Sequence, residues 1–141
     1  MFRDGLLRGK RILITGGGTG LGKSIGQRYV ELGARLVICG RRLEPLKTTA
    51  DEFRQAYCAD VETHSCDVRD AAAVEHMMAA IWKSGPLDVL VNNAAGNFLA
   101  RTERLSPRAV DAVIDIVLKG VTKIKIQLKF LCFIFILASH P

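Results

Sequence analysis

Residues 15–22, Thr-Gly-Gly-Gly-Thr-Gly-Leu-Gly, have the composition of a loop that binds phosphate. The apolar run at 11–14 before them is typical of a buried strand, and the periodicity of residues 23–32 after them indicates an amphipathic helix. A turn from a strand into a helix directs backbone N–H groups and the positive end of the helix dipole at an anion. Glycines suit such a turn because a Cβ would hold the ligand's oxygens away from the backbone, and because some positions require a positive φ.

Two nucleotide-binding patterns fit these residues, and the stretch alone does not choose between them. The P-loop pattern G-x-x-x-x-G-K-[ST] matches residues 17–24 and includes Lys23. The pattern T-G-x-x-x-G-x-G, found in dinucleotide-dependent enzymes, matches residues 15–22, whereas the strict G-x-G-x-x-G pattern has no placement there. A P-loop NTPase also requires a carboxylate at a strand end to help hold Mg²⁺, and Asp67 is the candidate. A glycine turn that binds nothing is the third interpretation.

Composition narrows the class of protein. The 141 residues are enough for one domain with its own core, and 49% of them are hydrophobic. Half of the formal charge of +6 comes from three lysines within residues 121–141, and no basic stripe carries interleaved aromatic residues, so we expect no nucleic-acid partner. The four cysteines lack C-x-x-C pairing and companion histidines, which predicts free thiols, no metal centre and a cytoplasmic location. No secretory signal or peroxisomal address is recognisable.

Strand-like and helix-like patterns alternate along the chain. Apolar runs predict strands at residues 11–14, 35–39 and 87–91, and a weaker pattern predicts a strand at residues 61–66. Helical patterns are expected over residues 23–32, 43–57, 70–83 and 106–118, and Asp70 is the expected N-cap of the third helix. This alternation predicts an α/β fold with a doubly wound parallel sheet of the Rossmann type. Right-handed crossovers then give about four strands in the order 3-2-1-4.

The second predicted strand ends without the acidic residue that normally binds the adenosine ribose 2′-hydroxyl of a dinucleotide. Gly40 stands there instead, followed by Arg41 and Arg42. Guanidinium groups form bidentate pairs with a 2′-phosphate, so the two arginines favour NADPH over NADH. The alternative is that both arginines only decorate a surface loop.

Two further motifs stand at the ends of predicted strands: Cys66-Asp67-Val68 after the third, and Asn-Asn-Ala-Ala-Gly at residues 92–96 after the fourth. The carboxyl ends of the strands form the ligand crevice of an open α/β sheet. Together with the glycine loop before them, and in this order, these motifs resemble those of the short-chain dehydrogenase/reductase family. The resemblance extends over about residues 6–120.

The resemblance implies that each motif contacts one part of a bound NADP(H). Five residues would cradle the pyrophosphate: Gly16, Thr19, Gly20, Leu21 and Gly22. Arg41 and Arg42 would bind the 2′-phosphate, and Asp67 with Val68 would contact the adenine. Three residues would line the ribose side and brace the central sheet: Asn93, Ala94 and Gly96. We therefore expect an NADP-binding domain over residues 1–120.

A finer resemblance connects the chain with the 2,4-dienoyl-CoA reductase branch of the family. It rests on three stretches: Asn-Asn-Ala-Ala-Gly-Asn-Phe at 92–98, Thr-Glu-Arg-Leu-Ser-Pro at 102–107 and Asp-Ile-Val-Leu at 115–118. Enzymes of this branch transfer a hydride from NADPH to an unsaturated fatty acyl-CoA, which implies a small-molecule, acyl-CoA substrate. Separately, we expect no membrane partner. Intact members of the family are expected to be homo-oligomers, an expectation that we do not extend to this chain.

The catalytic pair of the family has no counterpart in this sequence. The family's proton donor is a tyrosine four residues before a lysine, which lowers the tyrosine's pKa and orients the nicotinamide ribose. Tyr29 and Tyr57 are the two tyrosines, and Gly33 and Val61 stand four residues after them. We therefore expect the cofactor-binding half of a reductase, with no catalytic residue and no turnover.

Residues 121–141 depart from the family pattern. They contain no Asp, Glu, Arg or Gly, and their apolar run at 130–138 is too short to span a bilayer as a helix. We interpret them as an atypical tail from a truncated or frameshifted reading frame. The fourth strand would then be an open, aggregation-prone edge unless the tail adds a strand to it, and we expect poor solubility. The alternatives are an interfacial anchor, or a non-catalytic nucleotide-binding protein whose tail binds a partner or a membrane.

Overall fold

The computed structural model describes residues 3–94, 111 and 132–135, and strands alternate with helices along them. The elements are β1 (Arg11–Thr15), α1 (Gly20–Glu31), β2 (Arg35–Gly40), α2 (Leu43–Tyr57), β3 (Val61–Ser65), α3 (Ala71–Lys83), β4 (Val89–Asn92) and β5 (Cys132–Phe135). The strands and helices predicted within residues 3–94 are all confirmed, with ends that differ from the predicted ones by at most three residues. The helix predicted over 106–118 lies outside the described residues, apart from Asp111, which is helical.

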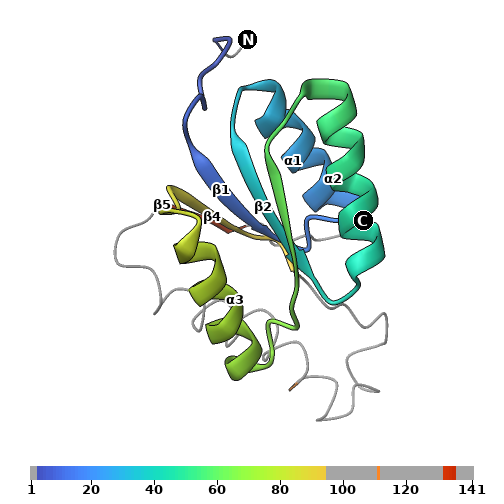
Figure 1. Cartoon of the computed structure of the whole chain (residues 1–141), viewed down its shortest axis with the longest axis vertical. Coiled ribbons are helices and arrows are strands. Elements are labelled where there is room, and N and C mark those ends of the chain that lie inside the picture. The colour runs from blue at the N-terminus through green and yellow to red at the C-terminus, as the bar shows by residue number, and fades with distance from the viewer. Residues whose placement is uncertain (1–2, 95–110, 112–131, 136–141) are drawn as a thin grey trace, which may run out of the picture.

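The sheet is parallel throughout its described strands, and its order is β3-β2-β1-β4-β5 (Figure 1). The predicted order 3-2-1-4 is therefore confirmed for the first four strands. Every residue of β1 is buried, because this strand lies between β2 and β4 and has helices on both of its faces. A strand in this position needs the continuous apolar run that the sequence provides.

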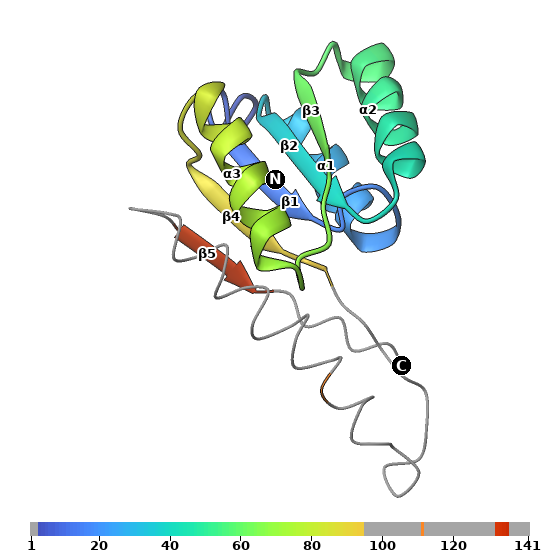
Figure 2. The same cartoon turned by 60° about the horizontal axis from the view of Figure 1, so that its bottom comes forward.

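The fifth strand comes from the tail, so the sheet has one strand more than the four expected. Residues Cys132–Phe135 pair in parallel with β4, with Phe133 opposite Leu90 and Ile134 opposite Val91 (Figure 2). An unpaired strand edge presents a row of free N–H and C=O groups, and an apolar segment of strand-forming residues can satisfy them. The tail thus covers the edge of β4, which was one of the two outcomes anticipated for it.

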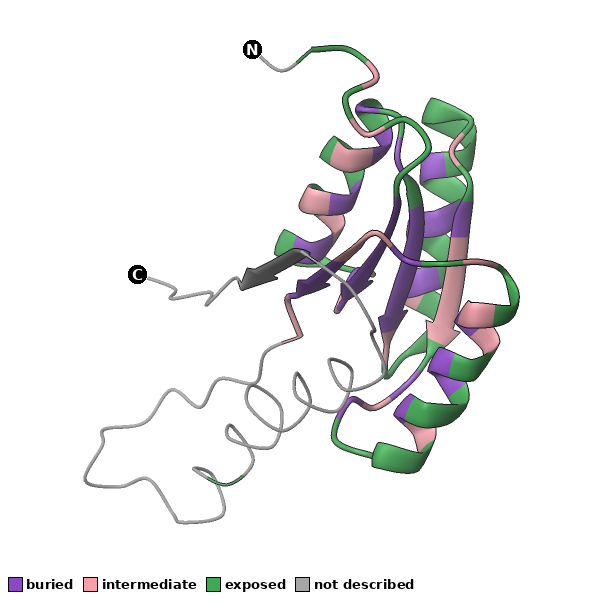
Figure 3. Cartoon of the chain, turned by 90° about the vertical axis from the view of Figure 1, so that its left-hand side faces the viewer, coloured by how far each residue is buried: buried purple, intermediate pink, exposed green. Residues whose placement is uncertain are grey.

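Two hydrophobic layers hold the helices to the sheet (Figure 3). On one face, α3 packs its apolar side against β1, β2 and β4, and the main contributors are Leu13, Val37, Leu90, Met77, Met78 and Ile81. On the other face, α1 and α2 pack through Ile12, Ile14, Leu36, Ile38, Leu46 and Phe53. The two methionines of α3, Met77 and Met78, are therefore core residues. Within the described part of the chain, no helix is long and apolar enough to cross a membrane.

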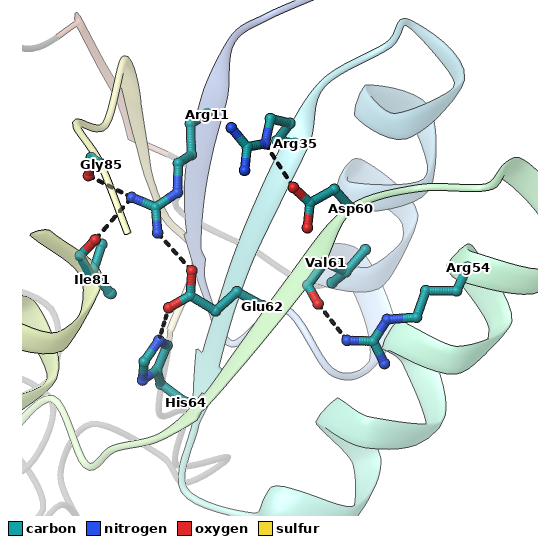
Figure 4. A network of polar contacts seen from close by, with 9 residues as sticks. All are labelled: Arg11, Arg35, Arg54, Asp60, Val61, Glu62, His64, Ile81 and Gly85. Atoms are coloured by element: carbon teal, nitrogen blue, oxygen red, sulfur yellow. Dashed lines mark hydrogen bonds and ion pairs between the residues drawn. The ribbon is translucent and has the colours of Figure 1, made fainter. Parts of the chain in front are cut away.

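One charged side chain is buried in this framework. Arg11, at the start of β1, is only 5% exposed, and its guanidinium donates to the carbonyls of Ile81 (2.9 Å) and Gly85 (2.6 Å) at the end of α3 (Figure 4). It also pairs with Glu62 of β3 at 2.6 Å, and Glu62 contacts His64 Nε2 at 2.6 Å. These contacts give a positive group to the negative end of α3 and satisfy carbonyls that the helix leaves unpaired. Arg11 lies at the amino edge of the sheet, opposite the predicted site.

Candidate nucleotide-binding site

Four strands deliver the predicted site residues to one edge of the sheet. Because β1 to β4 are parallel, their carboxyl ends lie together, and each is followed by one of the motifs. The glycine loop follows β1, the two arginines follow β2, Asp67 and Val68 follow β3, and Asn93 and Ala94 follow β4. Gly96 lies outside the described residues. The arrangement is the crevice in which open α/β sheets bind ligands.

The glycines of the loop are required for different structural reasons. Gly16 and Gly20 have φ values of +69° and +53°, in the left-handed region that favours glycine. A Cβ on Gly20 would meet no atom within 4 Å, so the loop is open to solvent at that point. A Cβ on Gly22 would lie 2.3 Å from the carbonyl oxygen of Gly16, so Gly22 is required for internal packing. Room for a ligand therefore exists at Gly20, whereas Gly22 lets α1 approach the loop.

The N-terminus of α1 is left open to an anion. Thr19 is the N-cap residue, but its side chain makes no capping hydrogen bond, and the first turn carries no acidic residue. The N-terminal N–H groups of a helix have no partner inside the helix and carry its positive dipole end. Thr19, Gly20 and Leu21 are all exposed. The loop and helix therefore present unsatisfied donors on an accessible surface, which is what a pyrophosphate requires.

Thr15 ties the loop to the end of β4, and it was not among the predicted site residues. Its side chain is buried, with a relative exposure of 2% for the residue, and its Oγ1 accepts hydrogen bonds from the backbone N–H groups of Asn93 (3.0 Å) and Ala94 (2.9 Å). The Asn93 side chain returns the contact, since its Nδ2 donates to the carbonyls of Thr15 (3.1 Å) and Gly16 (3.3 Å). Asn93 and Ala94 thus join the end of β4 to the end of β1 and to the glycine loop, and their place beside a cofactor ribose stays a prediction.

A second threonine ties the loop to α2. Thr49 Oγ1 donates to the carbonyl of Gly18 at 2.8 Å, and the residue is only 1% exposed. A pocket of about 500 Å³ opens beside this contact, between the loop and α2, and is lined by Gly18, Thr19, Gly20, Lys23, Glu44, Pro45, Thr48 and Thr49. No local sequence signal marks Thr49, because its partner lies 31 residues away.

The P-loop interpretation finds no support in the geometry. Lys23 forms an ion pair with Glu52 of α2 at 2.5 Å, whereas a P-loop lysine reaches the phosphates. The carboxylate of Asp67, the candidate for Mg²⁺, is held by Arg69 through contacts of 2.5–3.1 Å. These hydrogen bonds lower the pKa of Asp67. Among the described residues, no cluster of His, Cys, Asp or Glu is suited to a metal ion.

The two arginines after β2 lie at the same edge. Arg41 and Arg42 are exposed, and within the described part of the chain their guanidinium groups have no ion-pair partner. The backbone is fixed, since the carbonyl of Arg41 accepts from Ser65 Oγ at 3.2 Å and Arg42 is the N-cap of α2. Val68 is buried next to Asp67. Two available positive groups on a fixed backbone can receive a phosphate.

Cys39, Cys58 and Cys66 are free thiols, as predicted. Cys39 and Cys66 lie in the core, where burial raises the pKa of Cys39 to about 12 and that of Cys66 to about 11. Thiols are the unreactive form, so neither is a nucleophile at neutral pH. Cys58 is exposed at the C-terminus of α2.

Comparison with known proteins agrees with this geometry. The family model of the short chain dehydrogenases matches residues 10–128, which is most of the chain. A doubly wound sheet with a glycine loop after its first strand defines a nucleotide-binding protein. The chain belongs to the short-chain dehydrogenase family.

Relatives of this chain are oxidoreductases. An uncharacterized oxidoreductase of Caenorhabditis elegans is 47% identical over 130 residues, which are 91% of this chain and 42% of the relative. A protein of the same organism named "Probable 2,4-dienoyl-CoA reductase 3" is 44% identical over 134 residues, 94% of this chain and 43% of the relative. The solved NADP complex of RhlG from Pseudomonas aeruginosa is 31% identical with a TM-score of 0.82, over 91% of this chain and 50% of that one. The chain thus spans about half the length, or less, of these proteins.

Proposed function

We propose that this chain is the NADPH-binding half of a short-chain reductase. The observation that carries the proposal is made at the carboxyl edge of the sheet. The open N-terminus of α1 follows β1 there, and the two available arginines follow the neighbouring strand β2. The first group suits a pyrophosphate, and the second suits the 2′-phosphate that distinguishes NADPH from NADH. The NADP complex of RhlG, which has the same fold, supports the choice of cofactor.

The residues present fit this cofactor. The space beside Gly20, which a Cβ would fill, leaves room for the pyrophosphate oxygens against the N–H groups of Thr19 to Gly22. Arg41 and Arg42 would neutralise the 2′-phosphate, and Asp67 with Val68 would hold the adenine from the end of β3. Asn93 and Ala94 would line the ribose from the end of β4. When bound, NADPH supplies the hydride of the reaction, and the residues of this chain bind and orient it.

No tyrosine of this sequence is placed to act as the proton donor. Tyr57 ends α2, and a helix of 15 residues that starts at the site carries its end about 20 Å away. Its hydroxyl bonds to Gln27 (2.9 Å) and Glu31 (3.3 Å) instead. Tyr29 lies late in α1, and its partial burial raises its pKa, which opposes proton release. We therefore expect this chain to bind NADPH without turnover.

The substrate class of the intact reductase is proposed from its relatives. The C. elegans relative at 44% identity is named as a 2,4-dienoyl-CoA reductase, and the chain covers 43% of it. The stretches that carry this resemblance, at residues 92–98, 102–107 and 115–118, lie almost entirely outside the described residues. We propose hydride transfer to an unsaturated fatty acyl-CoA as the reaction of the intact enzyme.

Binding of the two nicotinamide cofactors tests the proposal. We expect calorimetry to give tighter binding of NADPH than of NADH, by about tenfold or more, because charge-assisted hydrogen bonds to the 2′-phosphate are worth about 1.5–3 kcal/mol each. The double variant Arg41→Gln/Arg42→Gln should lose this preference. Arg28→Gln, at an exposed arginine late in α1, should keep it. Equal affinities in the unmodified chain would contradict NADPH use, and NADPH oxidation at 340 nm with a 2,4-dienoyl-CoA would contradict the absence of turnover.

A further inference from the structure

The buried hydroxyl of Thr49 joins two parts of the site that bind different groups of the cofactor. Thr49 lies in the second turn of α2, and its Oγ1 donates to the carbonyl of Gly18 at 2.8 Å. The donor residue is 1% exposed, whereas Gly18 is half-buried beside the pocket, so the bond is partly shielded from water. An acceptor that loses its donor in such a place keeps part of its desolvation penalty, and the contact is therefore stronger than a fully exposed hydrogen bond.

The backbone of the loop lies directly on α2 at the same place. A Cβ on Gly18 would lie 3.1 Å from the backbone nitrogen of Leu46 and 3.2 Å from the carbonyl carbon of Pro45. Glycine is thus needed at this position for the loop to approach the helix closely. The ion pair between Lys23 and Glu52 also joins the loop's helix to α2, but both side chains are partly exposed, and such pairs contribute little.

The position of α2 fixes the two arginines. Arg42 is the N-cap of this helix and Arg41 precedes it, so any displacement of α2 relative to the loop moves both residues relative to the pyrophosphate site. NADH has no 2′-phosphate and would not use the two arginines, whereas NADPH has a 2′-phosphate at a set distance from its pyrophosphate and must satisfy both sites together. The position of the glycine loop relative to α2 should therefore affect the affinity for NADPH strongly and the affinity for NADH little.

We propose that Thr49 is a positioning residue that determines the preference for NADPH over NADH, a role that rests on the proposed function. It holds the glycine loop and α2 at the separation at which one molecule of NADPH reaches both.

The test compares the affinities of NADPH and NADH in threonine variants, with calorimetry on the full chain. Thr49→Val keeps the shape and removes the donor, and we expect the NADPH preference to fall roughly fivefold to tenfold, the lower end of the effect of an acceptor losing its partner, because the Gly18 carbonyl is only partly buried. Thr49→Ser keeps the hydroxyl and should keep the preference. Thr63→Val, the same replacement on β3, should also keep it. The ratio of two affinities measured on one sample does not depend on how much of the protein is folded.

Gly18→Ala perturbs the same contact from the loop side and serves if Thr49→Val does not fold. Its φ is not in the left-handed region, and its Cβ would press on Leu46 and Pro45, so it should also lower the NADPH preference. Equal weakening of NADPH and NADH, or no weakening, in both variants would overturn the role of Thr49 while leaving NADPH use intact. An unmodified chain without a preference for NADPH would overturn both proposals.

Discussion

Replacing Thr15 by valine should detach the glycine loop from the end of β4. Thr15 Oγ1 is the acceptor for two backbone N–H groups, those of Asn93 at 3.0 Å and Ala94 at 2.9 Å. Valine has nearly the same shape and strand preference, but it offers no acceptor. The third contact of the hydroxyl, to the carbonyl of Val91 at 3.5 Å, is too long to add much.

The size of the effect follows from the number of donors that lose their acceptor. Each buried donor left unsatisfied costs about 1–3 kcal/mol, which gives about 2–6 kcal/mol for two. Asn93 and Ala94 are only half-buried, so water can replace part of the loss. The extra buried methyl group of valine returns about 0.8 kcal/mol. We therefore expect the free energy of unfolding to fall by about 1–3 kcal/mol, a large share of the 5–15 kcal/mol typical of a domain.

Urea unfolding measures this loss, with the fluorescence of Trp82 as the probe. Trp82 is the single tryptophan and packs against the core layer of α3. Thr15→Ser keeps the acceptor and should lose clearly less stability than Thr15→Val. A valine variant within about 0.5 kcal/mol of the unmodified chain, which is the range of neutral surface changes, would refute the reasoning. So would a serine variant that is as unstable as the valine variant.

Three further predictions follow from single residues. Gly20→Ala should weaken NADPH binding more than tenfold in calorimetry, because its Cβ fills the open side of the loop. Gly9→Ala is the control, since Gly9 also has a positive φ (+79°) and equally open space. It should carry the same backbone strain of about 1–2 kcal/mol without the loss of binding. Cys58→Gly should raise the unfolding free energy by about 0.5–1 kcal/mol, since Cys58 has φ +51°, whereas Cys58→Ala should change little. The pKa of Asp88 is lowered in the folded chain, first because the backbone N–H of Arg11 donates to its carboxylate and then because Lys10 donates to it as well. The contribution of Asp88 to the free energy of unfolding is therefore complete above the ordinary aspartate pKa of about 3.9. It is lost as the pH falls through the lower pKa of the folded state. Asp88→Asn should therefore be less stable than the unmodified chain at neutral pH in urea unfolding, and this difference should shrink as the pH falls below about 4; a difference that persists unchanged at low pH would contradict the assignment.

The sheet and its order could be predicted because the sequence signals for them are local. The segments of β1, β2 and β4 are largely apolar, β3 has a weaker signal, and right-handed crossovers allow few orders for such strands. The N-cap of α3 has an equally local signal. Asp70 precedes the helical pattern, and its carboxylate accepts from the N–H groups of Ala72 (2.9 Å) and Ala73 (3.2 Å), as predicted.

The supports of the site could not be predicted because their partners are distant in the sequence. Thr15 bonds to residues 78 and 79 positions away, and the sequence shows it only as a β-branched residue at a strand end. The role of Thr49 was equally hidden, because the sequence shows it only as one residue of a helical pattern and its partner is 31 residues away. Arg11 begins an apolar strand, and its burial becomes intelligible only when Glu62 and the end of α3 are placed beside it. The contacts of these supporting side chains depend on the tertiary structure, and the adjacent residues in the sequence do not reveal them.

The glycines and the tail show a second limit of pattern reading. Gly20 and Gly22 count equally in a motif, yet one faces open space and the other packs against Gly16. The tail's apolar residues indicate a strand as well as they indicate an anchor. Pairing of Cys132–Phe135 with β4 depends on the edge that the rest of the sheet leaves open, which only the assembled sheet defines.

Amide chemical shifts during an NADPH titration locate the bound cofactor residue by residue, and they would test its proposed site at the carboxyl edge of the sheet. We predict saturable shifts in a ¹⁵N correlation spectrum at residues 16–22, at Arg41 and Arg42, and at Asp67 and Val68. The chemical shifts of amides at the amino edge of the sheet, such as that of Arg11, should not change. Shifts centred on the amino edge, or no saturable shift at residues 16–22, would contradict a cofactor site at the carboxyl edge.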